Sequence, residues 1–171
     1  MAVLGFHPTS TRLVLLCCGA VEPVPAASAP PPLSAAGRAA VEQAAAVLPP
    51  FAHIVASGQP AARETAEILA AARGVPVWWR DDLDELRSAE SLVEGGQRLH
   101  YALMAVGDRF HGRTTLVVSY PAVLTAFGAA QRGTVPTPDD VAALPDLSVA
   151  IVDYVEGRFY MVQDFPVRRG S

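Results

Sequence analysis

Two stretches of the chain are continuously apolar rather than alternating between apolar and polar residues. They are RLVLLCC at Arg12–Cys18 and TTLVVS at Thr114–Ser119. Such uninterrupted runs are typical of central strands in a parallel sheet, where helices cover both faces. Four further strands are predicted at His53–Ser57, Val75–Trp79, Ser148–Tyr154 and Arg158–Val162.

Between these segments apolar residues recur every three or four positions, which predicts helices. The first such run, for which Ser34 is a candidate N-cap, consists of Leu33, Gly37, Val41, Ala44 and Leu48. Further helices are predicted from Pro60 to about Gly74, from about Ser91 to Phe110, from Pro121 onward, and in TPDDVAALP after the cap residue Thr137. Alternating strands and helices favour an α/β three-layer sandwich, with helices flanking a central, mostly parallel sheet.

Composition narrows the class of protein. A chain of 171 residues with 51% hydrophobic and 18% charged residues is expected to form one globular domain, 1–171. A net charge of −4 argues against nucleic-acid and anionic-membrane partners. All 13 basic residues are arginine, and asparagine is absent, which excludes a Schiff-base lysine and an asparagine oxyanion hole. With no targeting segment and no apolar run of membrane-spanning length, a soluble cytoplasmic protein is expected.

Ligands of α/β sheets bind beyond the carboxyl ends of the strands. Three predicted strands end at candidate site corners: Cys17-Cys18-Gly19, Ser57-Gly58 and Ser119-Tyr120. The two cysteines are neighbours, so they do not indicate a disulfide framework. The histidines show no metal-ligand spacing, and neither a metal nor a cofactor is expected.

These corners and the helices around them resemble the histidine phosphatase superfamily, which includes the cofactor-dependent phosphoglycerate mutases. RLVLLCCGAVE is similar to the opening strand and Arg-His-Gly corner of that family, and PPLSAAGRAAVEQAAAVL to its first helix. FAHIVASGQPAARETAEILA, LDELRSAESLVEGGQRL and TTLVVSYPAVLTAF are similar to its later segments. The resemblance covers nearly the whole chain and implies a phosphoglycerate mutase-like fold.

The resemblance also implies that the basic residues of the family's phosphate pocket are missing. Family members bind phosphate with two arginines and two histidines, one of which is phosphorylated. Here the matching positions hold Cys17, Cys18, Ala61 and Tyr120. Only the acidic residue has a counterpart, Glu85, with Asp84 as a one-residue alternative. Losing two arginine–phosphate contacts should cost about 3–6 kcal/mol of anion binding.

The predicted pocket is lined by Cys17, Cys18, Gly19, Ser57, Ala61, Glu85, Ser119 and Tyr120. Each residue that is a candidate for a chemical role could instead have a purely structural one. Cys18 is either a nucleophile or a buried apolar residue. Tyr120 is either an acid or hydrogen-bond donor, or an aromatic plug, and Glu85 is either a pocket residue or a solvated loop residue. Arg63 is expected to turn away from the pocket and to pair with Glu67.

Three hypotheses for the function follow. The first is a catalytically inactive, regulatory or binding module that takes a neutral or cationic small molecule, or a partner protein. The second is a repurposed enzyme for an unphosphorylated metabolite, with Glu85 and Tyr120 as acid–base groups and Cys18 as a possible nucleophile. The third is a residual phosphatase that uses rearranged arginines. The ligand, the oligomeric state, and whether the Pro-rich segment 21–34 covers the pocket stay open.

Overall fold

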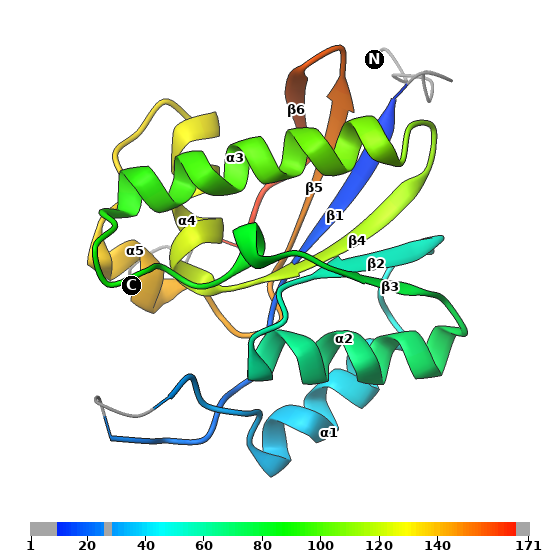
Figure 1. The fold of residues 1–171 in the computed structure, drawn as a ribbon, viewed down its shortest axis with the longest axis vertical. Helices are drawn as coiled ribbons and strands as arrows, with labels where there is room; N and C mark the ends of the chain where they lie inside the picture. The colour runs from blue at the N-terminus through cyan, green and yellow to red at the C-terminus, as the bar shows by residue number, and fades with distance from the viewer. Residues whose placement is uncertain (1–9, 26–28, 167–171) are drawn as a thin grey trace.

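A computed structural model describes residues 10–25 and 29–166 of the chain (Figure 1). The strands are β1 (Thr11–Cys17), β2 (His53–Ala56), β3 (Val77–Trp79), β4 (Thr114–Ser119), β5 (Val149–Val155) and β6 (Arg158–Gln163). The helices are α1 (Ala35–Ala44), α2 (Pro60–Arg73), α3 (Leu92–Arg109), α4 (Pro121–Gln131) and α5 (Pro138–Ala143), with a short 3-10 turn, η1, at Asp81–Leu83. Every predicted strand and helix is present, with ends shifted by a few residues at most.

The six strands form one sheet in the order β3-β2-β4-β1-β5-β6. The first four strands in this order are parallel to one another, whereas β5 runs antiparallel to β1, and β6 antiparallel to β5. Helices α1 and α2 cover one face, and α3 and α4 cover the other (Figure 1). The continuous apolar runs lie in β1 and β4, which pair at the centre and are almost wholly buried. The predicted α/β architecture is therefore confirmed, as a mixed sheet.

The helix ends follow from local chemistry. The Ser34 hydroxyl accepts a hydrogen bond from the Gly37 N–H at 2.9 Å, which caps α1 as predicted. Thr137 likewise caps α5 in a reciprocal arrangement with Asp140. Helix α2 ends at Gly74, whose φ of 64° is the left-handed conformation that favours glycine.

Helix α1 begins in direct contact with the chain that leaves β1. A Cβ atom at Gly37 would lie 2.1 Å from the carbonyl oxygen of Ala20, so only glycine fits. Beyond this contact the chain folds back on itself through a bridge between Val21 and Leu33. The described parts of segment 21–34 are therefore held at the carboxyl end of the sheet.

The predicted ion pair between Arg63 and Glu67 is wrong. The Arg63 Nε donates to the Gly58 carbonyl oxygen at 3.0 Å, and its guanidinium lies 4.9 Å from the centre of the Trp79 ring. An aromatic face on the neighbouring edge strand and a free carbonyl attract the cation more than an exposed carboxylate one turn away. Across 10–25 and 29–166, no helix combines the length and the apolarity that crossing a bilayer requires.

Candidate functional site

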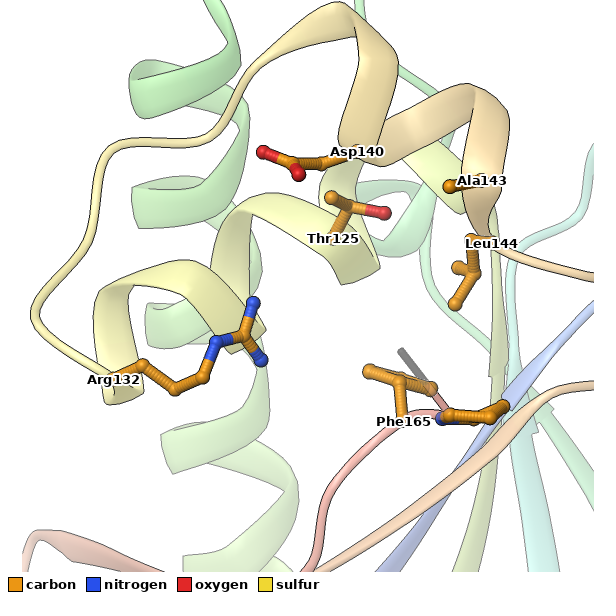
Figure 2. A pocket seen from close by; sticks show the side chains of 7 residues that line it. Thr125, Arg132, Asp140, Ala143, Leu144 and Phe165 are labelled. Carbon is orange, nitrogen blue, oxygen red and sulfur yellow. The ribbon is translucent and has the colours of Figure 1, made fainter. Parts of the chain in front are cut away.

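One hollow of the molecule lies away from the strand ends, between α4 and α5 (Figure 2). It is small, about 110 Å³, and its charged side chains already have partners within the chain. Arg132 binds the Asp164 carboxylate at 2.8 Å, and Asp140 accepts hydrogen bonds from Thr137. The charged groups of this hollow therefore serve contacts within the chain rather than a ligand.

A larger cavity, about 530 Å³, opens at the carboxyl end of the parallel strands, where ligands of such sheets bind. Its walls come from the end of β1, the described parts of segment 21–34, the start of α2, the loop after η1, the start of α4, and the loop before β5. The lining residues are Cys18, Gly19, Val21, Val24, Pro25, Ala29, Pro30, Pro31, Gln59, Glu85, Leu86, Tyr120, Pro121 and Asp146. This cavity is the candidate functional site.

Sequence reasoning predicted eight lining residues, and four of them line the cavity: Cys18, Gly19, Glu85 and Tyr120. The other four lie behind its wall: Cys17, Ser57, Ala61 and Ser119. The reason is packing. Each of these four side chains is at most 1% exposed, because the strand end and the first turn of α2 are covered by neighbouring side chains.

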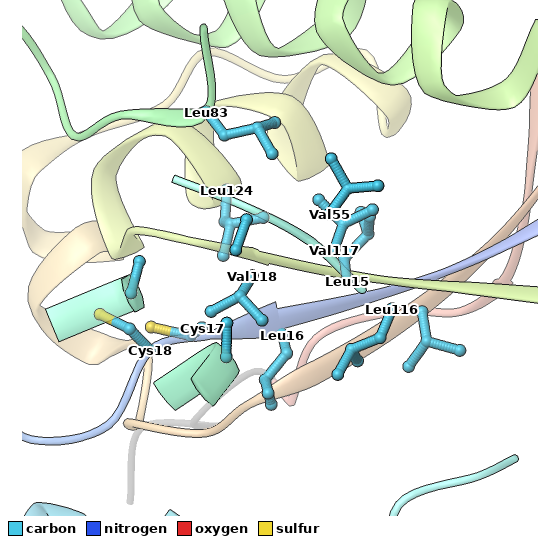
Figure 3. Packing of buried hydrophobic residues seen from close by; sticks show 14 of the residues in the cluster. Leu15, Leu16, Cys17, Cys18, Val55, Leu83, Leu116, Val117, Val118 and Leu124 are labelled. Carbon is cyan, nitrogen blue, oxygen red and sulfur yellow. The ribbon is translucent and has the colours of Figure 1, made fainter. Parts of the chain in front are cut away.

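The two cysteines belong to the hydrophobic core (Figure 3). Cys17 is 1% and Cys18 is 3% exposed. The Cys18 side chain and burial raise the pKa of the Cys17 thiol well above its usual value, and the carboxylates of Asp146 and Glu85 act in the same direction. Cys17 is therefore a neutral thiol at physiological pH, whereas a nucleophilic cysteine needs a nearby positive charge.

Ser57 and Ser119 hold the acidic loop that follows β3. The Ser57 hydroxyl donates to the Asp84 carboxylate, and the Ser119 hydroxyl donates to the Leu83 carbonyl oxygen at 2.7 Å. Both serines are fully buried. They act as anchors between two strand ends and the loop, not as reactive groups that face a ligand.

Tyr120 fills the space in front of α2. Its side chain is 7% exposed, and its hydroxyl oxygen accepts a hydrogen bond from the Ala62 N–H at 3.3 Å. Ala62 lies in the first turn of α2, so this hydroxyl satisfies one of the free N–H groups of the helix N-terminus. Burial raises the pKa of the Tyr120 hydroxyl, which makes it a weaker acid. These features favour a packing role for Tyr120, as an aromatic plug, over a role as an acid.

Glu85 lies in the loop after η1, and its carboxylate lies at the N-terminus of α4. Its Oε1 accepts a hydrogen bond from the Leu86 N–H at 2.8 Å, and its carboxylate is also hydrogen-bonded by the Ala122 N–H of α4. Burial raises the pKa of Glu85, and these N–H groups together with Arg98 offset part of that rise. Glu85 is thus a partly buried residue of the cavity rather than a solvated loop residue.

Arg98 organises the acidic loop, and sequence reasoning missed it. Its Nη1 donates to the carbonyl oxygens of Asp82 and Asp84 at 2.9 and 3.1 Å, and its Nη2 donates to that of Glu85 at 3.2 Å. It also binds both oxygens of the Glu90 carboxylate at 2.8 Å. One signal was available, because Arg98 lies at helical spacing between Gly95 and Ala102 on the buried face of α3.

Gln59 is the second residue that sequence reasoning missed. It lines the cavity, and its side-chain oxygen accepts a hydrogen bond from the Glu85 N–H at 2.9 Å. Arg98 thus binds the backbone carbonyl oxygen of Glu85, and Gln59 binds its backbone N–H. The position of the Glu85 carboxylate is therefore determined by residues far apart in the sequence.

The electrostatics of the cavity are acidic. Its charged lining residues are Glu85 and Asp146, and its described lining residues include no arginine and no histidine. At each of the two helix ends that could bind an anion, one N–H group already has a partner within the chain: the Ala62 N–H of α2 donates to the Tyr120 hydroxyl, and the Ala122 N–H of α4 to the Glu85 carboxylate. In the part of the chain that the structure describes, no group of three or more His, Cys, Asp or Glu side chains could hold a metal ion.

Comparison with known proteins agrees with this fold. The family model of the histidine phosphatase superfamily (branch 1) matches residues 21–89. Among solved structures, YhfR of Bacillus stearothermophilus is 22% identical, with a TM-score of 0.75 over 90% of this chain and 96% of that one. No curated protein matches the sequence.

Two further solved structures have the same fold at lower sequence identity. Phosphoserine phosphatase of Entamoeba histolytica, solved in complex with 3-phosphoglyceric acid, is 14% identical, with a TM-score of 0.77 over 92% of this chain and 98% of that one. Phosphoglycerate mutase of Bacillus anthracis is 13% identical, with a TM-score of 0.76 over 91% of this chain and 93% of that one. At these identities the likeness shows a phosphoglycerate mutase-like fold.

Proposed function

We propose that this chain is a histidine-phosphatase-like protein that performs no phosphoryl transfer and serves as a binding or regulatory module. One observation carries the proposal. The cavity at the strand ends presents two carboxylates, Glu85 and Asp146, and no cation among its described lining residues. Its ligand is a neutral or cationic small molecule, or an apolar segment of a partner protein.

The arginines near this end of the sheet support the same proposal. A residual phosphatase would need at least one of them to reach the cavity. Arg63 contacts Gly58 and Trp79, Arg80 pairs with Asp82 at 2.6 Å, and Arg98 pairs with Glu90. Moving any of these side chains to a phosphate would break its present contacts and bring the anion close to Glu85.

Vanadate and inorganic phosphate should leave the melting temperature of this protein unchanged relative to the same concentration of sulfate. An anion bound at a hundred times its Kd would add about 2.7 kcal/mol of stability. For a chain of this size that corresponds to a rise of about 5–10 °C. Sulfate is the control because excluded salts stabilise folded proteins without a site.

Thermal unfolding with each anion measures this directly, and hydrolysis of p-nitrophenyl phosphate should stay at the rate of a buffer blank. Stabilisation by vanadate beyond that by sulfate, or turnover above the blank, would refute the proposed function.

A repurposed enzyme is the second candidate, because Cys18, Glu85 and Tyr120 line one cavity. In this candidate the partly buried Glu85, whose pKa is raised, exchanges protons with the substrate. The burial of Cys18 opposes a thiol mechanism, since the thiol of a nucleophilic cysteine must be accessible.

Iodoacetamide at neutral pH should leave both thiols of the folded protein unmodified and alkylate both in concentrated guanidinium chloride. The physical reason is the burial of Cys17 and Cys18 together with the absence of a cation beside them in the described cavity wall. Intact-mass measurement counts the adducts. A single, rapidly formed adduct on the native protein that is absent from Cys18→Ser would instead support the enzyme candidate in which Cys18 is the nucleophile.

A further inference from the structure

Neither carboxylate of the cavity, Glu85 or Asp146, takes part in a salt bridge within the part of the chain that the structure describes. Five salt bridges are found among residues 10–25 and 29–166, and they use Asp153, Glu64, Asp82, Glu90 and Asp164. Arg98, the cation nearest to Glu85, binds its backbone oxygen and pairs with Glu90 instead. Glu85 and Asp146 therefore bring net negative charge to the cavity wall.

Most of the rest of the cavity wall is apolar, and Gln59 is its polar exception. The described parts of segment 21–34 contribute valine, proline and alanine side chains, and Leu86, Tyr120 and Pro121 also line the cavity. The volume of about 530 Å³ lies in the range of about 300–1,000 Å³ in which small-molecule sites occur. A ligand that fills this space must have an apolar body.

A ligand that covers these carboxylates removes water from them, and the cost of that desolvation depends on its charge. A neutral ligand leaves the carboxylates without compensation, and an anion adds repulsion. An ammonium group offsets the cost by ion pairing and hydrogen bonding in a partly buried site.

We propose that the cavity selects an amphipathic organic cation. Its protonated amine faces Glu85 and Asp146, while its apolar body packs against the valine and proline side chains from the described parts of segment 21–34. This inference rests on the proposed function, because it assumes that the cavity binds no phosphate. It narrows the ligand from neutral or cationic molecules to one chemical class.

Three probes of equal shape and different charge test the inference: phenylpropylamine, phenylpropanol and phenylpropionate. Calorimetric titration of the full chain should give an affinity for the amine at least about tenfold higher than for the alcohol, which corresponds to about 1.4 kcal/mol. Phenylpropionate should bind more weakly than either. The double variant Glu85→Gln/Asp146→Asn should bind amine and alcohol equally.

The matched control is Glu67→Gln, which removes an exposed carboxylate on α2 that does not line the cavity. This variant should keep the preference of the wild type for the amine. Equal binding of amine and alcohol by the wild type, an unchanged preference in the double variant, or no binding of any probe at millimolar concentration would overturn the inference. The vanadate experiment tests the proposed function separately, because binding of that anion would refute the function whatever the amine does.

Discussion

Replacing Arg98 by methionine should lower the free energy of unfolding by about 3–5 kcal/mol, the cost of removing one partner of a buried ion pair. The Arg98 and Glu90 side chains are 12% and 17% exposed. Methionine keeps most of the apolar stem, so the loss reports the guanidinium contacts. Besides Glu90, the carbonyl oxygens of Asp82, Asp84 and Glu85 lose a charged donor. Chemical denaturation measures the change.

The same variant should change how stability depends on pH. The Arg98 side chain, helped by the N–H and the charge of Arg87, lowers the pKa of Glu90 from 4.5 to about 2 in the folded protein. A lowered folded-state pKa gives stability that is fully present above pH 4.5 and is lost as the pH falls toward 2. The stability difference between wild type and Arg98→Met should therefore shrink across this window.

Arg87→Met is the control for the measurement of stability at neutral pH. Arg87 is exposed, and its side chain makes one long contact, 3.4 Å, with the Asp81 carbonyl oxygen. We expect a change within about 0.5 kcal/mol, as for ordinary surface substitutions. If Arg98→Met lowered the free energy of unfolding no more than this control does, Arg98 would not be the residue that holds the acidic loop.

Tyr120→Ala should destabilise the protein by about 3–5 kcal/mol, the usual cost of truncating a buried aromatic side chain. Tyr120→Phe should cost less, about 1–3 kcal/mol, because it keeps the ring and removes only the acceptor of the Ala62 N–H. Both values are measured by chemical denaturation at neutral pH.

The two Tyr120 variants together separate the aromatic plug from the acid. If the Tyr120 ring stabilises the protein by packing, the alanine variant must be much less stable than the phenylalanine variant, which keeps the ring. If both variants were as stable as the wild type, the ring would carry no packing energy. The residue would then be free for an acid–base role, as the alternative function requires.

The main elements of the fold were predictable from local sequence. The apolar runs at Arg12–Cys18 and Thr114–Ser119 predicted the central strands, because a strand covered on both faces has apolar residues at successive positions instead of at every second one. The cap residues Ser34 and Thr137 predicted helix starts that the structure confirms. Such signals involve residues within a few positions of one another.

The candidate site was predictable only in part. The corner of Cys18 and Gly19, together with Glu85 and Tyr120, lines the cavity as expected. The distinction between a side chain in the wall and one behind it was not predictable for Ser57 and Ser119. It depends on which hydrogen-bond partners the loop after β3 supplies.

The sequence by itself determined the strands, the helices and the placing of chemically distinctive residues at the ends of parallel strands, because hydrophobic periodicity and capping act locally. Only the tertiary structure decided what those residues do. Contacts between distant segments buried the two cysteines, placed the Tyr120 hydroxyl on α2 and bound Arg98 to the acidic loop. The charge of a cavity depends on all the side chains that the fold brings together. Here the described lining residues include Glu85 and Asp146 but no cation.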